Sequence, residues 1–405
     1  MAGLIHVLGG GPWQVPTVLR CRELGYRVLV TDPRPNQPAI AHADFHEAVD
    51  ITDVAATLAA SRRHGIDGIV CDTTDWGVYT AAFVADAMHL PGVGVEAALN
   101  VTNKVRMRRA TQAVGLASPR FAVLNSLADL TAGAAEVGLP LVVKPVDNQS
   151  GHGVSIVRTR SVLAAAARAA FEASRQGQVI LEQALVGIEI IVDGVVVDGY
   201  CHVLGIASKT PYTDNTTICS RILYGEVQDL PAPAEAIRQV FRATVTALGL
   251  RQGVVHAEFI VHGGSITPID VAARGGGVLI YRLVVPFVSG VDVNRTVIEQ
   301  CVGLSPPVQP LARPRCACIE FFRLPPGRLD AWHGAANARA TPGIGAVVLN
   351  LAAGDEIGAL ANKDERPGYI VALGETSQEV LASAAAAKSK LRASINGRQE
   401  QLQVI

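Results

Sequence analysis

Short apolar runs and helix-patterned stretches alternate through the first hundred residues. Runs rich in β-branched residues lie at Leu4–Leu8, Tyr26–Thr31 and Gly68–Cys71. Apolar residues at helical spacing occupy Val15–Leu24, Val54–His64 and Trp76–His89. Strands that alternate with helices predict a parallel sheet wrapped by helices. We therefore predict a small doubly wound α/β domain over residues 1–103.

The pattern changes after residue 103, where helices and strands lead into a polar loop. Elements are predicted at Val105–Val114, Phe121–Leu124, Leu127–Val137, Pro140–Pro145 and Val179–Leu185. Within Glu189–Val197, the dipeptide Asp193-Gly194 is typical of a tight turn and predicts two strands that fold back on each other. We predict a second domain over residues 104–305, with a mobile lid at about 120–185.

The last part of the chain follows the proline-rich stretch Ser305–Pro314. It alternates strands, at Ala317–Phe322 and Gly345–Leu351, with turns, and closes on a predicted helix over Ser377–Ile395. We interpret residues 306–405 as a C-terminal α/β lobe that completes the catalytic domain. The whole chain is predicted to be a mixed α/β (α+β) protein.

Composition and charge restrict the partners of this chain. Of 405 residues, 49% are apolar and only 18% are charged, which excludes disorder for most of it. A formal net charge of −1 removes the general attraction to phosphate backbones, so we expect no nucleic-acid partner. We also expect no membrane span, no signal peptide and reduced thiols at the seven cysteines, hence a cytoplasmic protein with small-molecule partners.

A glycine-rich loop, Gly9–Gln14, follows the first strand, and Asp32 ends the second. This arrangement is typical of dinucleotide sites. The fingerprint, however, needs a third glycine where this chain has Gln14. The loop therefore argues only weakly for NAD or FAD, and a structural turn or a contact for another small ligand stays open.

Lys144 lies inside an apolar strand, where its charge is costly unless an anion meets it. The loop Asn148–Gly153 follows at once and can fold its N–H groups over phosphate oxygens. The alternative is a lysine that reaches solvent at a strand end, beside an ordinary hairpin. Glu182 and Glu189 could accept hydrogen bonds from a nucleotide, although each taken singly favours the interpretation as a solvated surface charge.

Two apolar strands flank a Gly-Gly turn at residues 263–264, and each carries one acid, Glu258 or Asp270. Two carboxylates on neighbouring strands suit Mg²⁺ completed by phosphate and water. Zinc held through His256, which shares a strand face with Glu258, is the weaker interpretation. Arg274 precedes three glycines and can bind a carboxylate or phosphate bidentately. A surface hairpin is the alternative for this segment.

Taken in order, these segments resemble the ATP-grasp superfamily. The matching pieces are Asn103-Lys104 with Met107-Arg108, Val143-Lys144-Pro145, Ser150–Val154, Leu181–Gln183 with Gly187–Glu189, His256–Glu258, and Asp270–Gly276. The tail Arg366–Thr376 is similar to the C-terminal lobe of biotin-carboxylase-like members and of bacterial L-amino-acid ligases. The resemblance covers nearly the whole chain, and it makes residues 1–103 a Rossmann-like pre-ATP-grasp domain that binds no dinucleotide.

The resemblance implies a site for ATP and two Mg²⁺ ions between two lobes. Lys104 and Lys144 would bind the phosphates, Glu258 and Asp270 the metal, and Glu189 the ribose. Further nucleotide contacts would come from Ser150, Gly151, His152, Gly153, Val154, Glu182, Gln183 and the backbone near Leu185. Substrate contacts would come from Arg274, Gly275, Gly276, His256, Lys209 and Tyr212. Arg274 and Lys144 would be the catalytic residues.

Two departures from the family pattern concern the metal site. The family usually has an asparagine two residues after the second metal acid, where this chain has Ala272, and its second acid is the longer glutamate rather than Asp270. These changes predict one more loosely held ion, and leave a non-catalytic nucleotide-binding protein as an alternative.

The implied activity is that of an ATP-dependent carboxylate–amine ligase. An acyl phosphate would form, an amine would attack it, and ADP and phosphate would leave. An amino acid or small carboxylate is the expected substrate. The alternatives are a carboxylase or formyl-transferring enzyme of purine-type metabolism and, from another class, an NAD-dependent oxidoreductase. A homodimer is expected only by analogy with relatives.

Overall fold

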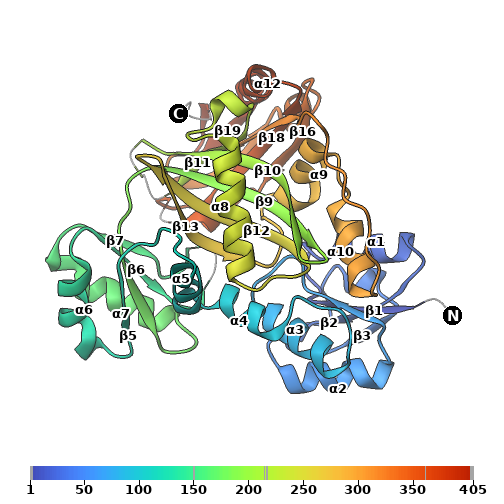
Figure 1. Ribbon diagram of the computed structural model, residues 1–405. Coiled ribbons are helices and arrows are strands. Elements are labelled where there is room, and N and C mark those ends of the chain that lie inside the picture. The colour runs from blue at the N-terminus through green and yellow to red at the C-terminus, as the bar shows by residue number, and fades with distance from the viewer. Residues whose placement is uncertain (1–2, 149–150, 214, 216–217, 361, 402–405) are drawn as a thin grey trace.

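The computed structural model describes residues 3–148, 151–213, 215, 218–360 and 362–401, arranged as four sheets with their helices (Figure 1). The first sheet is parallel, in the order β3-β2-β1-β4. Its strands are β1 (Leu4–Leu8), β2 (Arg27–Thr31), β3 (Phe45–Glu47) and β4 (Gly68–Val70). Its helices are α1 (Val15–Glu23), α2 (Val54–His64) and α3 (Val78–Ala87). The predicted parallel sheet is thus confirmed.

Two helices, α4 (Val95–Thr102) and α5 (Lys104–Ala113), lead from this sheet to the next (Figure 1). Asn103 separates them because its side chain accepts hydrogen bonds from the N–H groups of Val105 and Arg106, which starts α5. The second sheet is antiparallel, in the order β5-β8-β6-β7, and has a small core of its own. Its elements are β5 (Phe121–Leu124), α6 (Leu130–Val137), β6 (Leu141–Pro145), β7 (Ser155–Val157), α7 (Leu163–Ala173) and β8 (Val179–Gln183).

An eight-stranded antiparallel sheet forms the centre of the molecule, in the order β13-β12-β9-β10-β11-β14-β18-β16. Its strands are β9 (Ile188–Val197), β10 (Tyr200–Pro211), β11 (Cys219–Tyr224), β12 (Gly253–His262), β13 (Ser265–Ala272), β14 (Cys316–Phe321), β16 (Ile344–Leu349) and β18 (Gly368–Gly374). This sheet includes strands from both sides of residue 305. The predicted domain limits at residues 103 and 305 stay predictions.

Helices cover both faces of the central sheet, so strand β9 is apolar on both sides. Ile190 and Val192 join a core with helix α8 (Ala234–Ala247), whereas Ile191 and Val195 join a core with α9 (Val285–Ser289). Alternate side chains point to opposite faces of a strand, which explains this division. The segment η5 (Ile280–Val284) and helix α10 (Val293–Cys301) connect this region to the N-terminal sheet.

The predicted turn at Asp193-Gly194 is wrong, because β9 runs through both residues without interruption. The turn lies five residues later, where Asp198 (φ 50°) and Gly199 (φ 79°) both adopt the positive φ that a two-residue hairpin requires. Asp193 is buried and its carboxylate contacts Tyr224 and His256, so an Asp-Gly pair stands here inside a strand.

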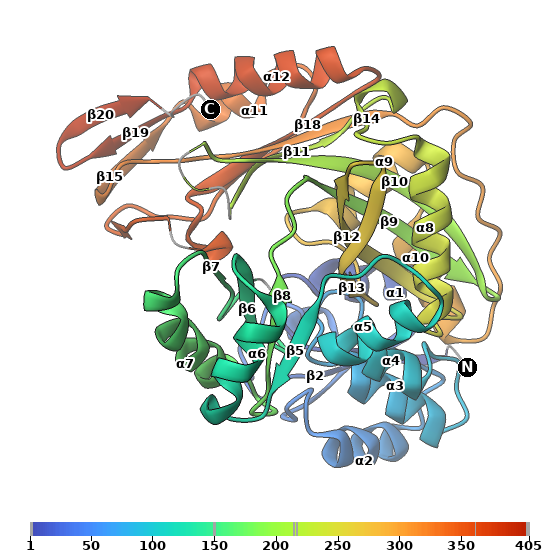
Figure 2. The ribbon, with the colours of Figure 1, turned by 60° about the vertical axis from the view of Figure 1, so that its left-hand side comes forward.

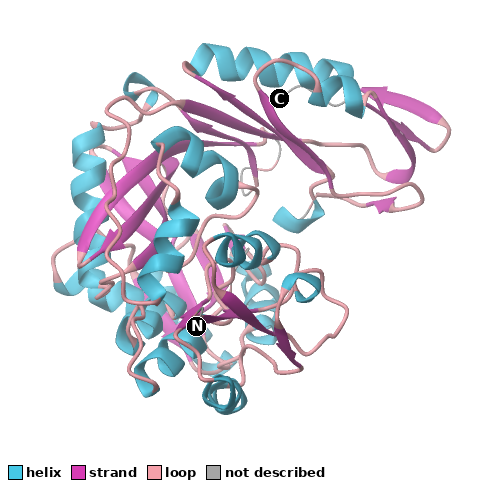
Figure 3. Ribbon diagram, turned by 90° about the vertical axis from the view of Figure 1, so that its right-hand side faces the viewer, coloured by secondary structure: helices cyan, strands magenta, loops and turns pink. Residues whose placement is uncertain are grey.

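The C-terminal part adds a smaller antiparallel sheet to the central one, in the order β17-β15-β19-β20 (Figure 2). Its strands are β15 (Gly327–His333), β17 (Glu356–Ile357), β19 (Arg392–Ile395) and β20 (Arg398–Gln401), and helix α11 spans Ala335–Arg339. Helix α12 (Ser377–Lys390) packs along β14 and β18 and lies at the top of Figure 3.

The predicted closing helix is therefore too long, because residues 392–395 form a strand. Asn396 (φ 50°) and Gly397 (φ 75°) turn the chain into β20, and an Asn-Gly pair is a strong hairpin signal that the helical pattern obscured. No helix in the described ranges is long and apolar enough to cross a membrane.

We predict that Gly194→Ala destabilises the protein, because an added Cβ would lie 2.7 Å from the Phe241 ring and 2.8 Å from the carbonyl oxygen of His202. Overpacking of this kind costs about 1–3 kcal/mol of unfolding free energy. Gly358→Ala is the matched control, since no atom lies within 4 Å of its added Cβ. Urea denaturation should show a lower midpoint for Gly194→Ala alone; equal midpoints would contradict the packing argument.

Candidate active site

A cavity of about 650 Å³ lies between the N-terminal sheet, the central sheet and residues 363–366. This volume lies within the range of small-molecule sites. Several residues predicted from the sequence line it: Gly151, Lys209, His256, Glu258, Asp270, Arg274, Gly275 and Gly276. The other predicted residues that the structure describes lie outside this lining, as the following paragraphs report.

Glu258 and Asp270 are direct partners across strands β12 and β13. Glu258 Oε1 lies 3.0 Å from Lys209 Nζ and 3.9 Å from Lys363 Nζ, and Asp270 Oδ1 lies 3.7 Å from Lys104 Nζ. Burial opposes the ionised form of Glu258, but the charges of Lys209 and Lys363 outweigh it and hold the pKa of this carboxyl well below its usual range. Both acids are therefore ionised carboxylates at neutral pH.

These two carboxylates fit Mg²⁺ better than zinc. In the part of the chain that the structure describes, no group of three or more His, Cys, Asp or Glu side chains forms a metal cluster. His256 Nδ1 is 2.7 Å from the Asp193 carboxylate and so is already engaged. Mg²⁺ accepts one or two protein carboxylates and takes its other oxygens from phosphate and water. Ala272, opposite His256 in the strand register, adds no oxygen ligand.

Lys144 meets a carboxylate, as its burial requires, and that carboxylate belongs to Glu182. Lys144 Nζ lies 2.8 Å from Glu182 Oε2, and Arg108 Nε lies 2.9 Å from Oε1. Arg108, fully buried in α5, also donates to the carbonyls of Pro268 and Ile269. Burial opposes ionisation of Glu182, yet Arg108 and Lys144 lower its pKa to about 2. Burial in turn lowers the pKa of Lys144.

The predicted phosphate loop lies next to Lys104, whose Nζ donates to the carbonyl of Asn148 at 2.9 Å. Gly153 needs to be glycine, because its φ is 72° and an added Cβ would lie 2.7 Å from the Cβ of Ala173. His152 Nε2 contacts Asp364 at 2.8 Å and so connects the loop to the C-terminal part. Val154 is exposed, and Ser150 lies outside the described residues.

Lys209 joins two predicted site residues, since its Nζ contacts both Glu189 and Glu258. Burial opposes the charge of Lys209, but these two carboxylates outweigh it and raise its pKa. Tyr212, by contrast, is buried in the core and donates its hydroxyl to the carbonyl of Phe322 at 3.1 Å. Gln183 and Leu185 lie at the end of β8 and just beyond it, both partly buried.

Arg274 follows β13 and reaches into the N-terminal part, where its Nε lies 3.1 Å from Asp75 Oδ1. The glycines after it allow close packing. A Cβ on Gly275 would lie 2.1 Å from Tyr281 Cγ, and one on Gly276 would lie 2.8 Å from His256 Nδ1. The Arg-Gly-Gly sequence therefore brings backbone, an aromatic ring and an imidazole together at one end of the cavity.

The glycine-rich loop also lines the cavity, through Gly9, Gly11 and Gln14. The Gln14 amide fills the space beside Gly9, 3.2 Å from where a Cβ would stand, and donates to Thr73 at 2.7 Å. A third glycine would let the helix pack closely at this point, but the side chain of Gln14 occupies the space. This geometry supports the interpretation of the loop as a contact for a small ligand other than a dinucleotide.

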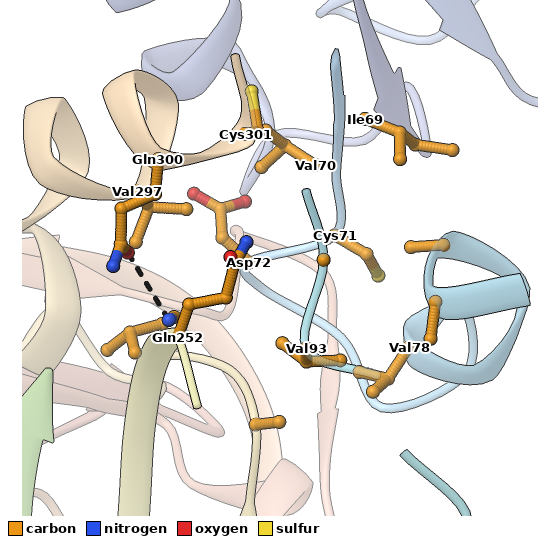
Figure 4. Close-up of a pocket in the computed structure, with 16 residues that line it drawn as sticks. Ile69, Val70, Cys71, Asp72, Val78, Val93, Gln252, Val297, Gln300 and Cys301 are labelled. Carbon is orange, nitrogen blue, oxygen red and sulfur yellow. Dashed lines mark hydrogen bonds between the residues drawn. The ribbon is translucent and has the colours of Figure 1, made fainter. Parts of the chain in front are cut away.

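A second cavity, of about 50 Å³, lies between β4 and α10 and is too small for a nucleotide (Figure 4). Gln300 Oε1 accepts from the N–H of Gly253 at 3.2 Å beside it. Asp72 lines this cavity, and its Oδ2 accepts from Thr17 while Oδ1 has no hydrogen-bond partner among the described residues. We interpret this cavity as a packing defect at the contact of two layers, large enough for water.

Sequence reasoning gave no role to several charged residues around the site. Arg108 was part of a motif, but its contact with Glu182 depends on how α5 crosses the second sheet. Asp193 was assigned to a turn, and Lys363 had no motif. Asp75 had a usable signal, because polar residues at the carboxyl end of a parallel strand commonly line ligand sites.

The comparisons with known proteins agree with this geometry. Residues 137–281 match the family model of the ATP-grasp domain, and residues 320–396 match that of L-amino acid ligase C-terminal domain 2. The crystal structure of an L-amino acid ligase from Bacillus licheniformis superimposes with a TM-score of 0.80, at 22% identity, over 96% of this chain and 98% of that one.

Two curated relatives are formate-dependent phosphoribosylglycinamide formyltransferases. The protein from Burkholderia pseudomallei strain 668 is 26% identical over 361 residues, which is 84% of each chain. The one from Synechococcus sp. strain CC9902 is 32% identical over 188 residues, 45% of this chain. The match spans about half the length of the Synechococcus relative.

These matches and the fold show that residues 137–281 form an ATP-grasp domain, as predicted, and proteins with this domain generally use ATP with Mg²⁺. Residues 320–396 form an L-amino acid ligase C-terminal domain 2. The predicted ligase-type C-terminal lobe is thereby confirmed.

We predict that Arg108→Met unfolds more easily than the unchanged protein, because it leaves the buried Glu182 with one cation instead of two. Breaking a buried ion pair costs about 3–5 kcal/mol. Arg106→Met, in the same helix but at an exposed pair with Glu96, should cost less than about 1 kcal/mol. Chemical denaturation measures both values. Similar losses of unfolding free energy for the two variants would refute the stabilising role of Arg108 and Lys144 at Glu182.

Stability should also depend on pH through Glu182. Its pKa is about 2 in the folded protein against 4.5 normally, so its contribution is complete above pH 4.5 and is lost as pH falls toward 2. Glu182→Gln removes this titration. A plot of unfolding free energy against pH should therefore be shallower for Glu182→Gln between these limits. Parallel curves would show that Glu182 is not the group that titrates.

Proposed function

We propose that this chain is an ATP-dependent carboxylate–amine ligase, which forms an amide bond through an acyl phosphate and releases ADP and phosphate. One observation carries the proposal: the paired carboxylates Glu258 and Asp270 and the guanidinium of Arg274 line a single cavity of about 650 Å³. The match to L-amino acid ligase C-terminal domain 2 supports an amino acid as a substrate.

In this proposal the lysines exchange their present partners for phosphate. Lys104 now contacts Asp270, and Lys144 contacts Glu182. We propose that both ammonium groups would contact the triphosphate of ATP between the second sheet and β13. The described loop residues, Gly151 to Val154, would cover the phosphates together with Ser150. Glu182, Gln183 and the backbone near Leu185 would bind adenine, and Glu189 would bind the ribose.

Glu258 and Asp270 would hold Mg²⁺, and we propose two ions. When bound, Mg²⁺ would neutralise phosphate charge and offset the loss of the lysine contacts. The two carboxylates are ionised and, among the described residues, belong to no cluster of three or more metal-ligating side chains, which suits an ion completed by phosphate oxygens. With Ala272 in place of an amide ligand, one ion would rely more on water or substrate oxygens.

The bond changes then balance without an enzyme nucleophile. A carboxylate oxygen of the substrate attacks the γ-phosphorus of ATP, and the bond from that phosphorus to the bridging oxygen of ADP breaks. The amine nitrogen next attacks the acyl carbon, the carbon–oxygen bond to phosphate breaks, and the amine gives up a proton. Arg274 would hold the oxygens of the acyl phosphate, and the contact between His152 and Asp364 would help to exclude water.

A second candidate function is formyl transfer to an amine in purine-type metabolism. The 26% identity to a formate-dependent phosphoribosylglycinamide formyltransferase, over 84% of each chain, favours it. The chemistry is the same with formate as the carboxylate, so the substrates decide between the two functions. We also propose a homodimer and a cytoplasmic location, which sedimentation and fractionation would test.

The deciding experiment measures ADP release from MgATP over a matrix of carboxylates and amines. The matrix should include the amino acids in pairs, formate with a phosphoribosyl amine, and bicarbonate. We expect release only when an amino acid or small carboxylate and an amine are both present. Release with formate alone among the carboxylates would favour the second function. No release with any combination would overturn an enzymatic role.

We predict that Arg274→Ala loses turnover by on the order of 10²–10³ while nucleotide binding survives. The reason is that Arg274 would contact the acyl phosphate and not adenine or ribose. Steady-state ADP release measures the first effect, and calorimetric titration with MgADP measures the second. Arg295→Ala, an exposed ion-paired arginine on α10, is the control. Unchanged ADP release by Arg274→Ala would eliminate this role.

A further inference from the structure

The contact between Asp75 and Arg274 connects two layers of the molecule, although the two residues lie 199 positions apart in the chain. Asp75 lies on the loop after β4 of the N-terminal sheet, and Arg274 follows β13 of the central sheet. Arg274 Nε lies 3.1 Å from Asp75 Oδ1, and Arg274 Nη2 lies 3.2 Å from Oδ2. Both carboxylate oxygens therefore contact one edge of the guanidinium in a bidentate pair, which is the strongest common geometry for an arginine and a carboxylate.

The remaining donors of Arg274 can be counted. A guanidinium has five N–H bonds. Asp75 accepts from Nε and from Nη2, and the carbonyl of Gly275 accepts from Nη1 at 2.9 Å. Among the described residues, these contacts leave one N–H bond on each terminal nitrogen. Two such donors side by side match the two oxygens of a carboxylate or phosphate.

The loop that carries Asp75 is itself fixed to the segment that carries Arg274. The carbonyl of Asp72 accepts from the N–H of Gly275 at 2.9 Å. The Asp72 carboxylate is buried and accepts from Thr17 at 2.8 Å and from Asn294 at 3.2 Å. These bonds hold residues 72–75 against residues 274–275. Asp75 is therefore in a defined position and acts as more than a mobile counter-ion.

We propose that Asp75 is a positioning residue: it holds the guanidinium of Arg274 so that the two free N–H bonds face the oxygens of the acyl phosphate. The inference rests on the function proposed above. It makes the N-terminal layer part of the reaction site. Loss of Asp75 would leave Arg274 charged but free to rotate, and the substrate oxygens would be held poorly.

The first experiment compares Asp75→Asn with Asp75→Glu. Asparagine keeps the size of the side chain but offers one acceptor oxygen, whereas glutamate keeps both oxygens. Using the pair of substrates most active in the ADP-release matrix, we expect Asp75→Asn to lower kcat/KM for the carboxylate about tenfold to hundredfold, as losses of supporting hydrogen bonds do. The KM for ATP should stay within about twofold, since Asp75 would act through Arg274, which would contact the acyl phosphate and not adenine or ribose. Asp75→Glu should recover part of the loss.

Asp86→Asn is the matched control, because Asp86 is an exposed carboxylate on α3 of the same N-terminal layer. It should match the unchanged protein in every assay. Thermal unfolding of all three variants shows whether an effect is merely structural. A loss in Asp75→Asn that affects kcat, both KM values and thermal stability together would overturn the positioning role.

A binding experiment separates this inference from the proposed function. Inorganic phosphate is titrated into protein saturated with MgADP, so that no turnover is needed. We expect Asp75→Asn and Arg274→Ala to weaken phosphate binding about tenfold, with MgADP affinity unchanged. If Arg274→Ala weakens phosphate and Asp75→Asn does not, the inference about Asp75 fails and the ligase proposal stands. If phosphate binds both variants as it binds the unchanged protein, Arg274 is not the anion site, and both fail.

Discussion

Buried charges that must be neutralised by opposite charges determine how the parts of this protein meet. Glu182, Glu258 and Asp270 are acids of three different strands, and each contacts a lysine. An unpaired charge at the buried Glu182 or Arg108 would cost several kcal/mol. Charged contacts also join the parts of the molecule: Lys104 of α5 contacts Asp270 of β13, Arg108 contacts both Glu182 and the carbonyls of Pro268 and Ile269, and Lys363 of the C-terminal part contacts Glu258.

The same pairs bear on the proposed chemistry. In that proposal Lys104 would leave Asp270 for phosphate, and the Asp270 carboxylate is the kind of oxygen ligand that Mg²⁺ prefers. Lys144 would turn from Glu182 to phosphate, while Arg108 would keep the buried Glu182 carboxylate paired. Arg274 differs from these lysines, because Asp75 contacts one edge of it and two donors stay free.

Much of the architecture could be predicted from local patterns. The strands of the N-terminal sheet and the hairpin of β12 and β13 follow from apolar runs, a Gly-Gly turn and the two-residue period of a strand. The direct pairing of Glu258 with Asp270 depends on a register shift between Glu258 and Phe259, which this period does not predict. The predicted secondary structure was wrong where one segment carried signals for two different elements. Asp193-Gly194 has the composition of a turn, but burial between two cores keeps it inside β9, and the Asn396-Gly397 turn was hidden by a helical pattern that ends at Lys390.

The amino-acid sequence by itself indicated the ATP-grasp domain, from several segments in order, and the candidate metal acids and Arg274, from residue type and spacing within one hairpin and its end. Only the tertiary structure decided which charges meet: Arg108 and Lys144 at Glu182, Lys209 at both Glu189 and Glu258, and Asp75 at Arg274. The reason is physical. Each of these contacts joins residues of different elements, and their distance depends on how sheets and helices pack, which no local pattern along the chain encodes.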